Sequence, residues 1–269
     1  MEEHNWQEEW AALQEKWRSQ LTFETPQELE KLLQDSSQSL NLKIGGVDLS
    51  FVDNDKSACA AYVVMTCRSN DGTSKKKCKF SPDSSFQVIY EDLRMVELVG
   101  PYVPGFLAFR EAGPIIDMVK HQQQTKPEVT PDVLIVDGNG LLHPRKFGLA
   151  CHVGLKLDLP TIGVAKNLYY LQSNDETTAE NRRRHREESR EKLRIRGDHF
   201  DIYGPDQPDN PLGIALKTAR DAENPVYVSS GHKISLERCK DVVLRCSSFR
   251  IPEPTRQADI RSREFIRKL

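Results

Sequence analysis

Two short stretches decide the fold of this chain: Ile44-Gly-Gly-Val-Asp48-Leu-Ser-Phe51 and Val133-Leu-Ile-Val-Asp137-Gly-Asn-Gly140. Each has the apolar character and the length of a buried strand, and each contains an aspartate. Side chains alternate along a strand, so Asp48 points away from the face that Val47 occupies. Asp137 ends its strand, and open α/β sheets bind their ligands at the carboxyl ends of parallel strands.

Two more acids complete a set of four: Glu111 in Phe106-Leu-Ala-Phe-Arg-Glu111 and Asp259 in Arg256-Gln-Ala-Asp259-Ile260. Taken singly, Asp48 is explained as a salt-bridge partner and Asp137 as a turn initiator. Together the four acids favour a cradle for a hard divalent cation, because a buried carboxylate is costly unless something neutralises it. Oxygen ligands without a Cys or His cluster favour Mg²⁺ or Mn²⁺ over Zn²⁺. Such a site most often handles phosphate.

The segments around these acids predict one mixed sheet. Apolar runs bounded by turn residues predict strands at Lys43–Val52, Ala58–Cys67, Phe86–Leu98, Asp132–Asp137, Thr161–Ala165, Gly213–Leu216 and Val226–Ser229. The first three follow one another with no helix predicted between them, which is typical of an antiparallel meander, and the next two have the continuous hydrophobicity of buried parallel strands.

Between these strands, apolar residues recur at the spacing of a helix. This spacing predicts helices at Phe106–His121, Phe147–Leu157, Ser235–Cys246 and Thr255–Lys268. Ser235 and Thr255 are the expected N-caps of the last two helices. We therefore expect an α/β fold in which an antiparallel meander followed by parallel strands is flanked by helices.

The chain is long enough for one large α/β domain, and we expect a single domain at residues 41–269. Residues 1–40 are predicted to form a helical extension packed on that domain, because Trp6, Trp10 and Trp17 share one helical face. Residues 174–196 are predicted to form a charged helical insertion. A solvated helix is the simpler interpretation of that insertion, and a basic helix facing nucleic acid is the alternative.

Composition narrows the class of protein further. The formal net charge of 269 residues is −2, so no global basic character marks a nucleic-acid binder. The six cysteines include no C-x-x-C pair, and the N-terminus has no apolar signal segment, so we expect an intracellular protein that is not secreted. No apolar run is long enough to cross a membrane. We expect a cytoplasmic monomer, with the nucleus and nucleolus as the alternative compartments.

Several longer motifs carry a family resemblance. They are Gly46-Val-Asp48, Pro101-Tyr-Val-Pro-Gly-Phe-Leu-Ala-Phe-Arg-Glu111, Val136-Asp-Gly-Asn-Gly-Leu-Leu-His-Pro-Arg145, Gly163-Val-Ala-Lys166, Ser230-Gly-His232 and Pro254-Thr-Arg-Gln-Ala-Asp259. The chain resembles endonuclease V, a family of metal-dependent nucleases with an RNase H-like fold that act at deaminated purines. The stretch Arg250-Ile-Pro-Glu-Pro254 is similar to the animal members, which mainly cut inosine-containing RNA.

The resemblance implies roles for individual residues. Asp48 and Asp137 match the direct metal ligands, and Glu111 and Asp259 match acids that act through water. Lys166 matches a lysine near the scissile phosphate. His232 is also expected to be a catalytic residue, although a hydrogen-bonding role before a helix is its simpler explanation.

The remaining matches concern the nucleic acid. Tyr102, between Pro101 and Pro104, matches a wedge that fills the gap left by a displaced base. Positions matching the hypoxanthine pocket are Gly105, Leu107, Gly138, His143, Leu149 and Tyr169. Tyr169 departs from the smaller apolar residue expected at its position.

These features together predict an endonuclease that binds Mg²⁺, with Mn²⁺ as a substitute. Its predicted substrate is inosine-containing single-stranded RNA, with DNA as the alternative. It would hydrolyse the second phosphodiester bond 3′ of inosine and leave 3′-hydroxyl and 5′-phosphate ends. Two other readings stay open: a non-cleaving inosine-RNA binding protein, and another RNase H-like nuclease selective for structure.

Overall fold

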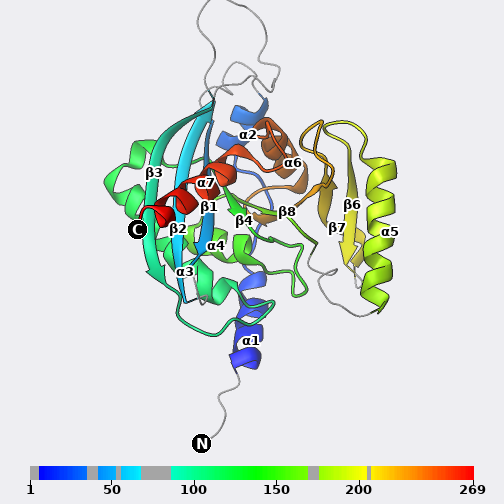
Figure 1. Ribbon diagram of the computed structural model, residues 1–269, viewed down its shortest axis with the longest axis horizontal. Coiled ribbons are helices and arrows are strands. Elements are labelled where there is room, and N and C mark those ends of the chain that lie inside the picture. The colour runs from blue at the N-terminus through cyan, green and yellow to red at the C-terminus, as the bar shows by residue number, and fades with distance from the viewer. Residues whose placement is uncertain (1–5, 35–41, 53–55, 68–85, 169–175, 205–206) are drawn as a thin grey trace, which may run out of the picture.

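The computed structural model describes residues 6–34, 42–52, 56–67, 86–168, 176–204 and 207–269. The strands within these residues are β1 (Lys43–Phe51), β2 (Ser57–Cys67), β3 (Phe86–Glu97), β4 (Val133–Asp137), β5 (Thr161–Ala165), β6 (His199–Gly204), β7 (Gln207–Leu216) and β8 (Val226–His232). They form one mixed sheet in the order β3-β2-β1-β4-β5-β8-β7-β6 (Figure 1).

The helices cover both faces of this sheet. They are α1 (Trp6–Arg18), α2 (Gln27–Gln34), α3 (Ala108–Thr125), the 3-10 turn η2 (Pro127–Val129), α4 (Leu149–Leu157), α5 (Glu176–Lys192), α6 (Leu236–Arg245) and α7 (Glu253–Arg267). Figure 1 shows α6 and α7 on the near face and α3 and α4 behind the sheet. The predicted α/β fold with a mixed sheet between helices is confirmed.

The first three strands form the predicted antiparallel meander, with β2 between β1 and β3. Strand β4 then pairs parallel with β1, and β5 pairs parallel with β4. The parallel strands are buried on both faces, which is why their sequences are continuously apolar. This arrangement puts the carboxyl ends of β4 and β5 at the same edge of the sheet.

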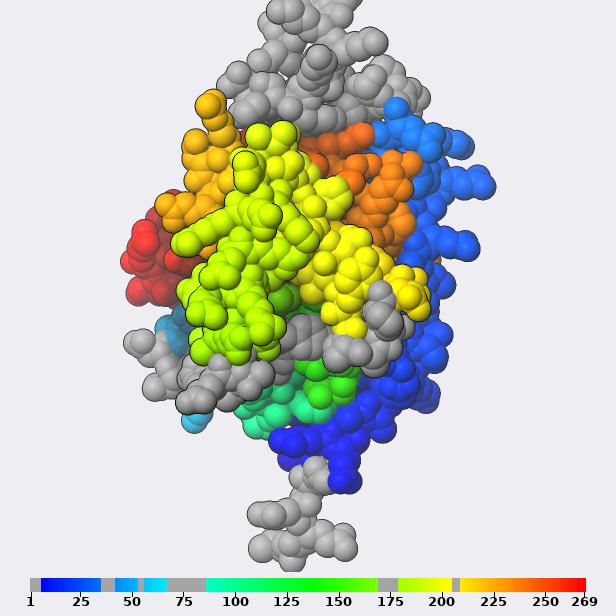
Figure 2. Space-filling model, turned by 90° about the vertical axis from the view of Figure 1, so that its right-hand side faces the viewer, coloured from blue at the N-terminus to red at the C-terminus, as the bar shows by residue number. Residues whose placement is uncertain are grey.

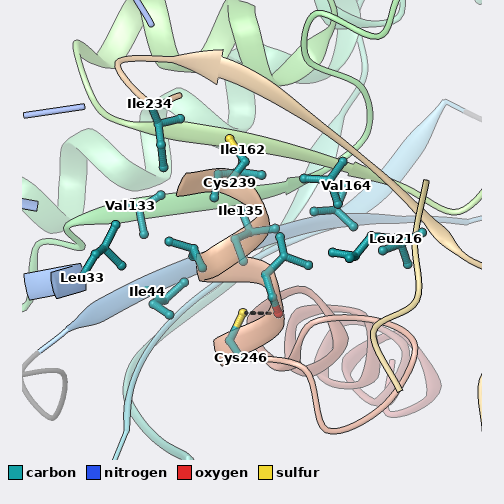
Figure 3. Close-up of a cluster of buried hydrophobic side chains, with 14 of the residues drawn as sticks. Leu33, Ile44, Val133, Ile135, Ile162, Val164, Leu216, Ile234, Cys239 and Cys246 are labelled. Carbon is teal, nitrogen blue, oxygen red and sulfur yellow. Dashed lines mark hydrogen bonds between the residues drawn. The ribbon is translucent and has the colours of Figure 1, made fainter. Parts of the chain in front are cut away.

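Alternate residues of β4 enter different cores. Val133 and Ile135 pack toward α6, in the cluster that Figure 3 shows beside Cys239 and Cys246. Leu134 and Val136, which alternate with them along β4, pack toward α3 and α4 instead. Burial on both faces therefore fixes the register of β4, because a slip of one residue would move each side chain to the opposite face of the sheet.

The far side of the sheet differs from the sequence prediction. Strand β6 was not predicted, and β7 begins at Gln207 rather than Gly213. The pairing of β6 with β7 is irregular near Tyr203 and Pro211. Proline lacks a ladder donor and is found at strand edges and irregularities, so it concealed the first half of β7.

The two predicted N-caps have different outcomes. Ser235 caps α6, because its hydroxyl accepts a hydrogen bond from the backbone N–H of Arg238 at 3.3 Å. The prediction for Thr255 is wrong: α7 begins at Glu253, and Pro252 occupies the cap position. The Thr255 hydroxyl donates to the Pro252 carbonyl at 3.1 Å instead. Proline favours the first helical turn, where no N–H partner is needed.

Charged helix α5 lies along the surface beside β6, as a ridge on the face that Figure 2 shows. It is attached through Leu193 just after its end and through His185, whose ring is 2.9 Å from the Tyr227 hydroxyl. In the described parts of the chain, no helix is long and apolar enough to cross a lipid bilayer.

Candidate metal centre and nucleic-acid interface

Sheet register brings three predicted site residues together. The pairs Gly46↔Ile135 and Ile135↔Ile162 align the three central strands. Two residues further along each strand, on the same face, lie Asp48 and Asp137. Lys166 directly follows β5 on the neighbouring strand, and its ammonium is 2.5 Å from the Asp137 carboxylate.

Asp48 is an acid in an unfavourable position. It is only 7% exposed and lies within hydrogen-bonding reach of the Asp137 carboxyl. Burial raises its pKa well above the ordinary value, and the negative charges of Asp137 and Asp259 raise it further, while Lys166 opposes the rise. Without a cation, the Asp48 carboxyl therefore keeps its proton to a higher pH than an ordinary aspartate does.

Two more acids reach this place from helices on opposite faces. Glu111 comes from the first turn of α3, and burial raises its pKa to about 7, with Arg110 opposing and Asp137 adding to the rise. Asp259 comes from α7 and is 2.8 Å from the Arg263 guanidinium. The sheet edge is where helices from both faces can approach the same point.

One cavity of about 500 Å³ contains all of these groups. Its walls include Asp48, Glu111, Asp137, Asp259 and Lys166. Leu149, predicted to line the base pocket, borders the same cavity. Four acids that are far apart in the sequence thus converge on one space, as the strand aspartates predicted.

The donor set fits a magnesium-type ion. Among the described residues, no three His, Cys, Asp or Glu side chains form a closed cage. Mg²⁺ does not need one, because it commonly takes one or two carboxylates and fills its other positions with water and phosphate oxygens. Asp48 and Asp137 supply the two carboxylates, and their mutual repulsion gives a physical reason for a cation there.

Lys166 is held at the site by charge. Burial lowers its pKa, but the carboxylates of Asp137, Asp48 and Asp259 outweigh burial, and the net shift is upward. The ammonium therefore stays protonated beside the cavity. A substrate phosphate entering here would meet a fixed positive charge.

The structure adds residues that were not predicted as site residues. Ser50, two positions after Asp48 on the same strand face, lies 2.7 Å from the Ser262 hydroxyl of α7. Arg263 follows Asp259 by one helical turn and lines the cavity. Both had a sequence signal, because spacings of two in a strand and four in a helix put side chains together.

The proline-bounded loop presents its tyrosine outward. Tyr102 is 59% exposed, and Pro101 and Pro104 are exposed on either side of it. The loop closes at Gly105, where φ is +82°, a conformation that side chains with a Cβ rarely adopt. The Phe106 N–H then donates to the Val103 carbonyl at 2.9 Å before α3 begins.

The other predicted base-contacting residues lie in two neighbouring loops. His143 is buried and bonds to the backbone of Gly105; burial, with Arg145 adding to it, lowers the His143 pKa to about 4. Gly138 has φ +152° and faces the Leu149 side chain. Leu107 is partly buried at the N-cap of α3. Tyr169 lies outside the described residues.

The catalytic role predicted for His232 is not supported by its position. His232 pairs with Thr161 at the start of β5, whereas Lys166 follows the end of that strand. Its ring accepts a hydrogen bond from the Thr22 N–H at 3.4 Å and lies 3.6 Å from the exposed Asp158 carboxylate. His232 therefore lies at the opposite edge of the sheet from the acidic cavity.

The motif around His232 has a packing role instead. The Ser230 carbonyl accepts from the Leu141 N–H at 2.8 Å, and the Ser229 hydroxyl accepts from the Gly140 N–H at 2.9 Å. A Cβ on Gly140 would be 2.2 Å from the Ser230 oxygen. Strand β8 thus supports the loop that follows Asp137.

The strand order β3-β2-β1-β4-β5, with helices on both faces and acids at the parallel edge, defines an RNase H-like α/β protein. A family model described as endonuclease V matches residues 27–260. The chain is 44% identical to endonuclease V of Mus musculus over 227 residues, covering 84% of this chain and 60% of the mouse protein. The chain belongs to the endonuclease V family, and the predicted resemblance is confirmed.

Solved structures agree with this assignment. A crystal structure of human ENDOV superposes with a TM-score of 0.78 at 38% identity, covering 97% of this chain and 98% of that one. A Ciona intestinalis endonuclease V, in complex with a 24mer DNA containing an inosine followed by a ribo-adenosine, gives 0.73 at 30% identity, covering 97% of both chains.

Proposed function

We propose that this protein is a Mg²⁺-dependent endonuclease, with Mn²⁺ as a substitute, that recognises inosine in single-stranded RNA. The proposed cut is at the second phosphodiester bond 3′ of inosine, leaving 3′-hydroxyl and 5′-phosphate ends. The observation that carries the proposal is the single cavity that joins Asp48, Glu111, Asp137 and Asp259 with Lys166. The inosine assignment is supported by the family and by the Ciona relative's complex with inosine-containing DNA.

The acids and the lysine divide the chemistry between them. Asp48 and Asp137 would hold the cation, which when bound neutralises a phosphoryl oxygen and acidifies a water. Glu111, with a pKa near 7, can accept a proton from a water at neutral pH. Lys166 offsets the negative charge that grows on the phosphate oxygens.

The base-recognition part of the proposal uses the loops beside the cavity. Tyr102 is exposed, so its ring can take the place of a displaced base in the stack, and such stacking contributes about 1–3 kcal/mol per base. His143 is neutral above its lowered pKa; its Nδ1 accepts from the Arg145 N–H at 3.3 Å and its ring bonds to the Gly105 backbone, so it would serve recognition by holding the Gly105 peptide beside the base. The glycine backbones at 105 and 138 allow close approach to a flipped base.

Matched 5′-labelled RNA and DNA strands, each with either inosine or adenosine at one position, test the proposal. We expect cleavage of the inosine RNA strand in Mg²⁺ and none in EDTA. Tight inosine-RNA binding without cleavage in Mg²⁺ or Mn²⁺ would identify a non-cleaving reader instead. Cleavage that ignores the base and follows strand structure would identify a structure-selective nuclease.

A further inference from the structure

Helix α1 makes a polar contact with the loops of the proposed base pocket. Gln14 lies on the apolar face of α1 between Trp10 and Trp17, and it is only 1% exposed. It precedes residues 27–260, the part of the chain that matches the endonuclease V family, and lies in none of the family motifs. A buried amide in an apolar stripe is costly unless every polar atom finds a partner.

The Gln14 amide connects three separate segments. Its Nε2 donates to the Gly105 carbonyl at 3.3 Å and to the Phe147 carbonyl at 3.1 Å. Its Oε1 accepts from Arg145 Nε at 2.5 Å. The partners determine the orientation of the amide, because two carbonyls need the NH₂ group and a guanidinium needs the oxygen.

Arg145 completes the connection. Its second nitrogen donates to the same Gly105 carbonyl, and its guanidinium lies 3.8 Å from the centre of the Phe106 ring. His143 bonds to the Gly105 backbone as well. The Gly105 peptide, at the closing turn of the Tyr102 loop, is thus held by groups from α1 and from the His143 loop.

Aromatic packing keeps α1 in place, so that Gln14 can act as a fixed point. The Trp10 ring stacks on Phe109 with centroids 4.9 Å apart and an interplanar angle of 7°. The Trp17 ring packs 4.8 Å from His152 of α4. These contacts join α1 to α3 and α4, the helices that follow the two loops.

We propose that Gln14 is a positioning residue for base recognition: it fixes the Tyr102 loop relative to the His143 loop, and so fixes the width of the pocket for a 6-keto purine. The inference rests on the proposed function, since it concerns selectivity for inosine. A shift of either loop would weaken contacts to the flipped base, whereas Asp48 and Asp137 are held by strands β1 and β4 and would keep their places. Gln14 therefore acts through Gly105 and Arg145 and touches no reacting atom.

The test compares Gln14→Met with Gln14→Ala, with Lys16→Ala on the exposed face of α1 as the matched control. Methionine keeps the length of the side chain and removes its amide, so folding is protected. The readout is the ratio of kcat/KM for inosine and adenosine strands, measured well below each variant's melting temperature. We expect the inosine preference to fall about tenfold in both Gln14 variants, which corresponds to a loss of about 1.4 kcal/mol in discrimination between the two strands. The control should keep the wild-type ratio.

A second measurement does not involve the substrate. Amide hydrogen exchange in peptides covering residues 101–107 and 143–148 should be faster in Gln14→Met than in wild type. A lower melting temperature with unchanged preference and unchanged loop exchange would make Gln14 merely structural and overturn the inference alone. A wild-type enzyme with no preference for inosine would overturn the proposed function and this inference together.

Discussion

Replacing Asp48 with asparagine should stabilise the metal-free protein at alkaline pH. In the folded chain, burial and the neighbouring carboxylates raise the pKa of Asp48 from an ordinary 3.8 to about 8. Between these two values the folded protein holds a proton that the unfolded chain has released. The unfolding free energy therefore falls as the pH rises through this window, by up to about 1.4 kcal/mol per pH unit.

The size of this fall in the unfolding free energy depends on the pH range that is measured. Between pH 6.0 and pH 8.5, about two pH units lie below the raised pKa of Asp48. Over this range, ionisation of Asp48 should lower the unfolding free energy of wild type by roughly 3 kcal/mol. For a chain of this size that corresponds to about 6–12 °C in the melting temperature. Asparagine imitates the protonated carboxyl and cannot ionise, so Asp48→Asn should lose the Asp48 part of this fall and keep the smaller part that comes from Glu111, whose pKa burial raises to about 7.

Thermal melts in EDTA at both pH values measure the effect. The matched control is Asp117→Asn, which removes an exposed carboxylate on α3 and should keep the wild-type pH dependence. Adding Mg²⁺ at pH 8.5 should raise the melting temperature of wild type more than that of Asp48→Asn, because a ligand that binds only the folded state stabilises it. If Asp48→Asn melts at or below wild type at pH 8.5 in EDTA, the Asp48 carboxyl carries no electrostatic strain and the reasoning fails.

Three further predictions concern activity and binding. Asp137→Ala should abolish cleavage in Mg²⁺ and leave inosine-strand binding in place, because it removes one of two proposed ligands; turnover near the wild-type rate would contradict this. Tyr102→Ala should weaken binding to an inosine strand by about 5- to 150-fold, as expected for one lost stacking contact of about 1–3 kcal/mol, and should affect an unmodified strand less; equal losses in a filter-binding assay would remove Tyr102 from lesion recognition. Arg186 and Arg190 are exposed one turn apart on α5, and neither forms an ion pair with a described residue, so changing both to serine should weaken binding equally for inosine and adenosine strands. The salt dependence of binding should then fall by roughly 0.7 per lost phosphate contact, and an unchanged slope would mark α5 as ordinary solvated surface.

The sequence by itself determined the local parts of the structure. Strand β5 runs from Thr161 to Ala165 as predicted, because an apolar run bounded by turn residues is a local signal. The direction of Asp48 was equally local, since the two-residue alternation of a strand separates it from Val47. The family motifs then indicated which acids belong together, and the cavity contains all four.

Tertiary structure alone decided matters that depend on strand order and on which edge of the sheet a residue reaches. His232 belongs to one of the family motifs, yet antiparallel pairing of β8 with β5 puts it at the edge opposite Lys166. Strand β6 was missed because it pairs only with β7, at the end of the sheet, where half of its side chains are exposed.

Gln14 is the clearest example of a residue whose contacts only the tertiary structure decides. Its place in an apolar helical stripe is visible in the sequence, but its partners are not. The amide contacts Gly105, Arg145 and Phe147, which lie 91 to 133 positions away in the chain. Local pattern can reveal a buried polar group, whereas only the packing of distant segments determines what satisfies its hydrogen bonds.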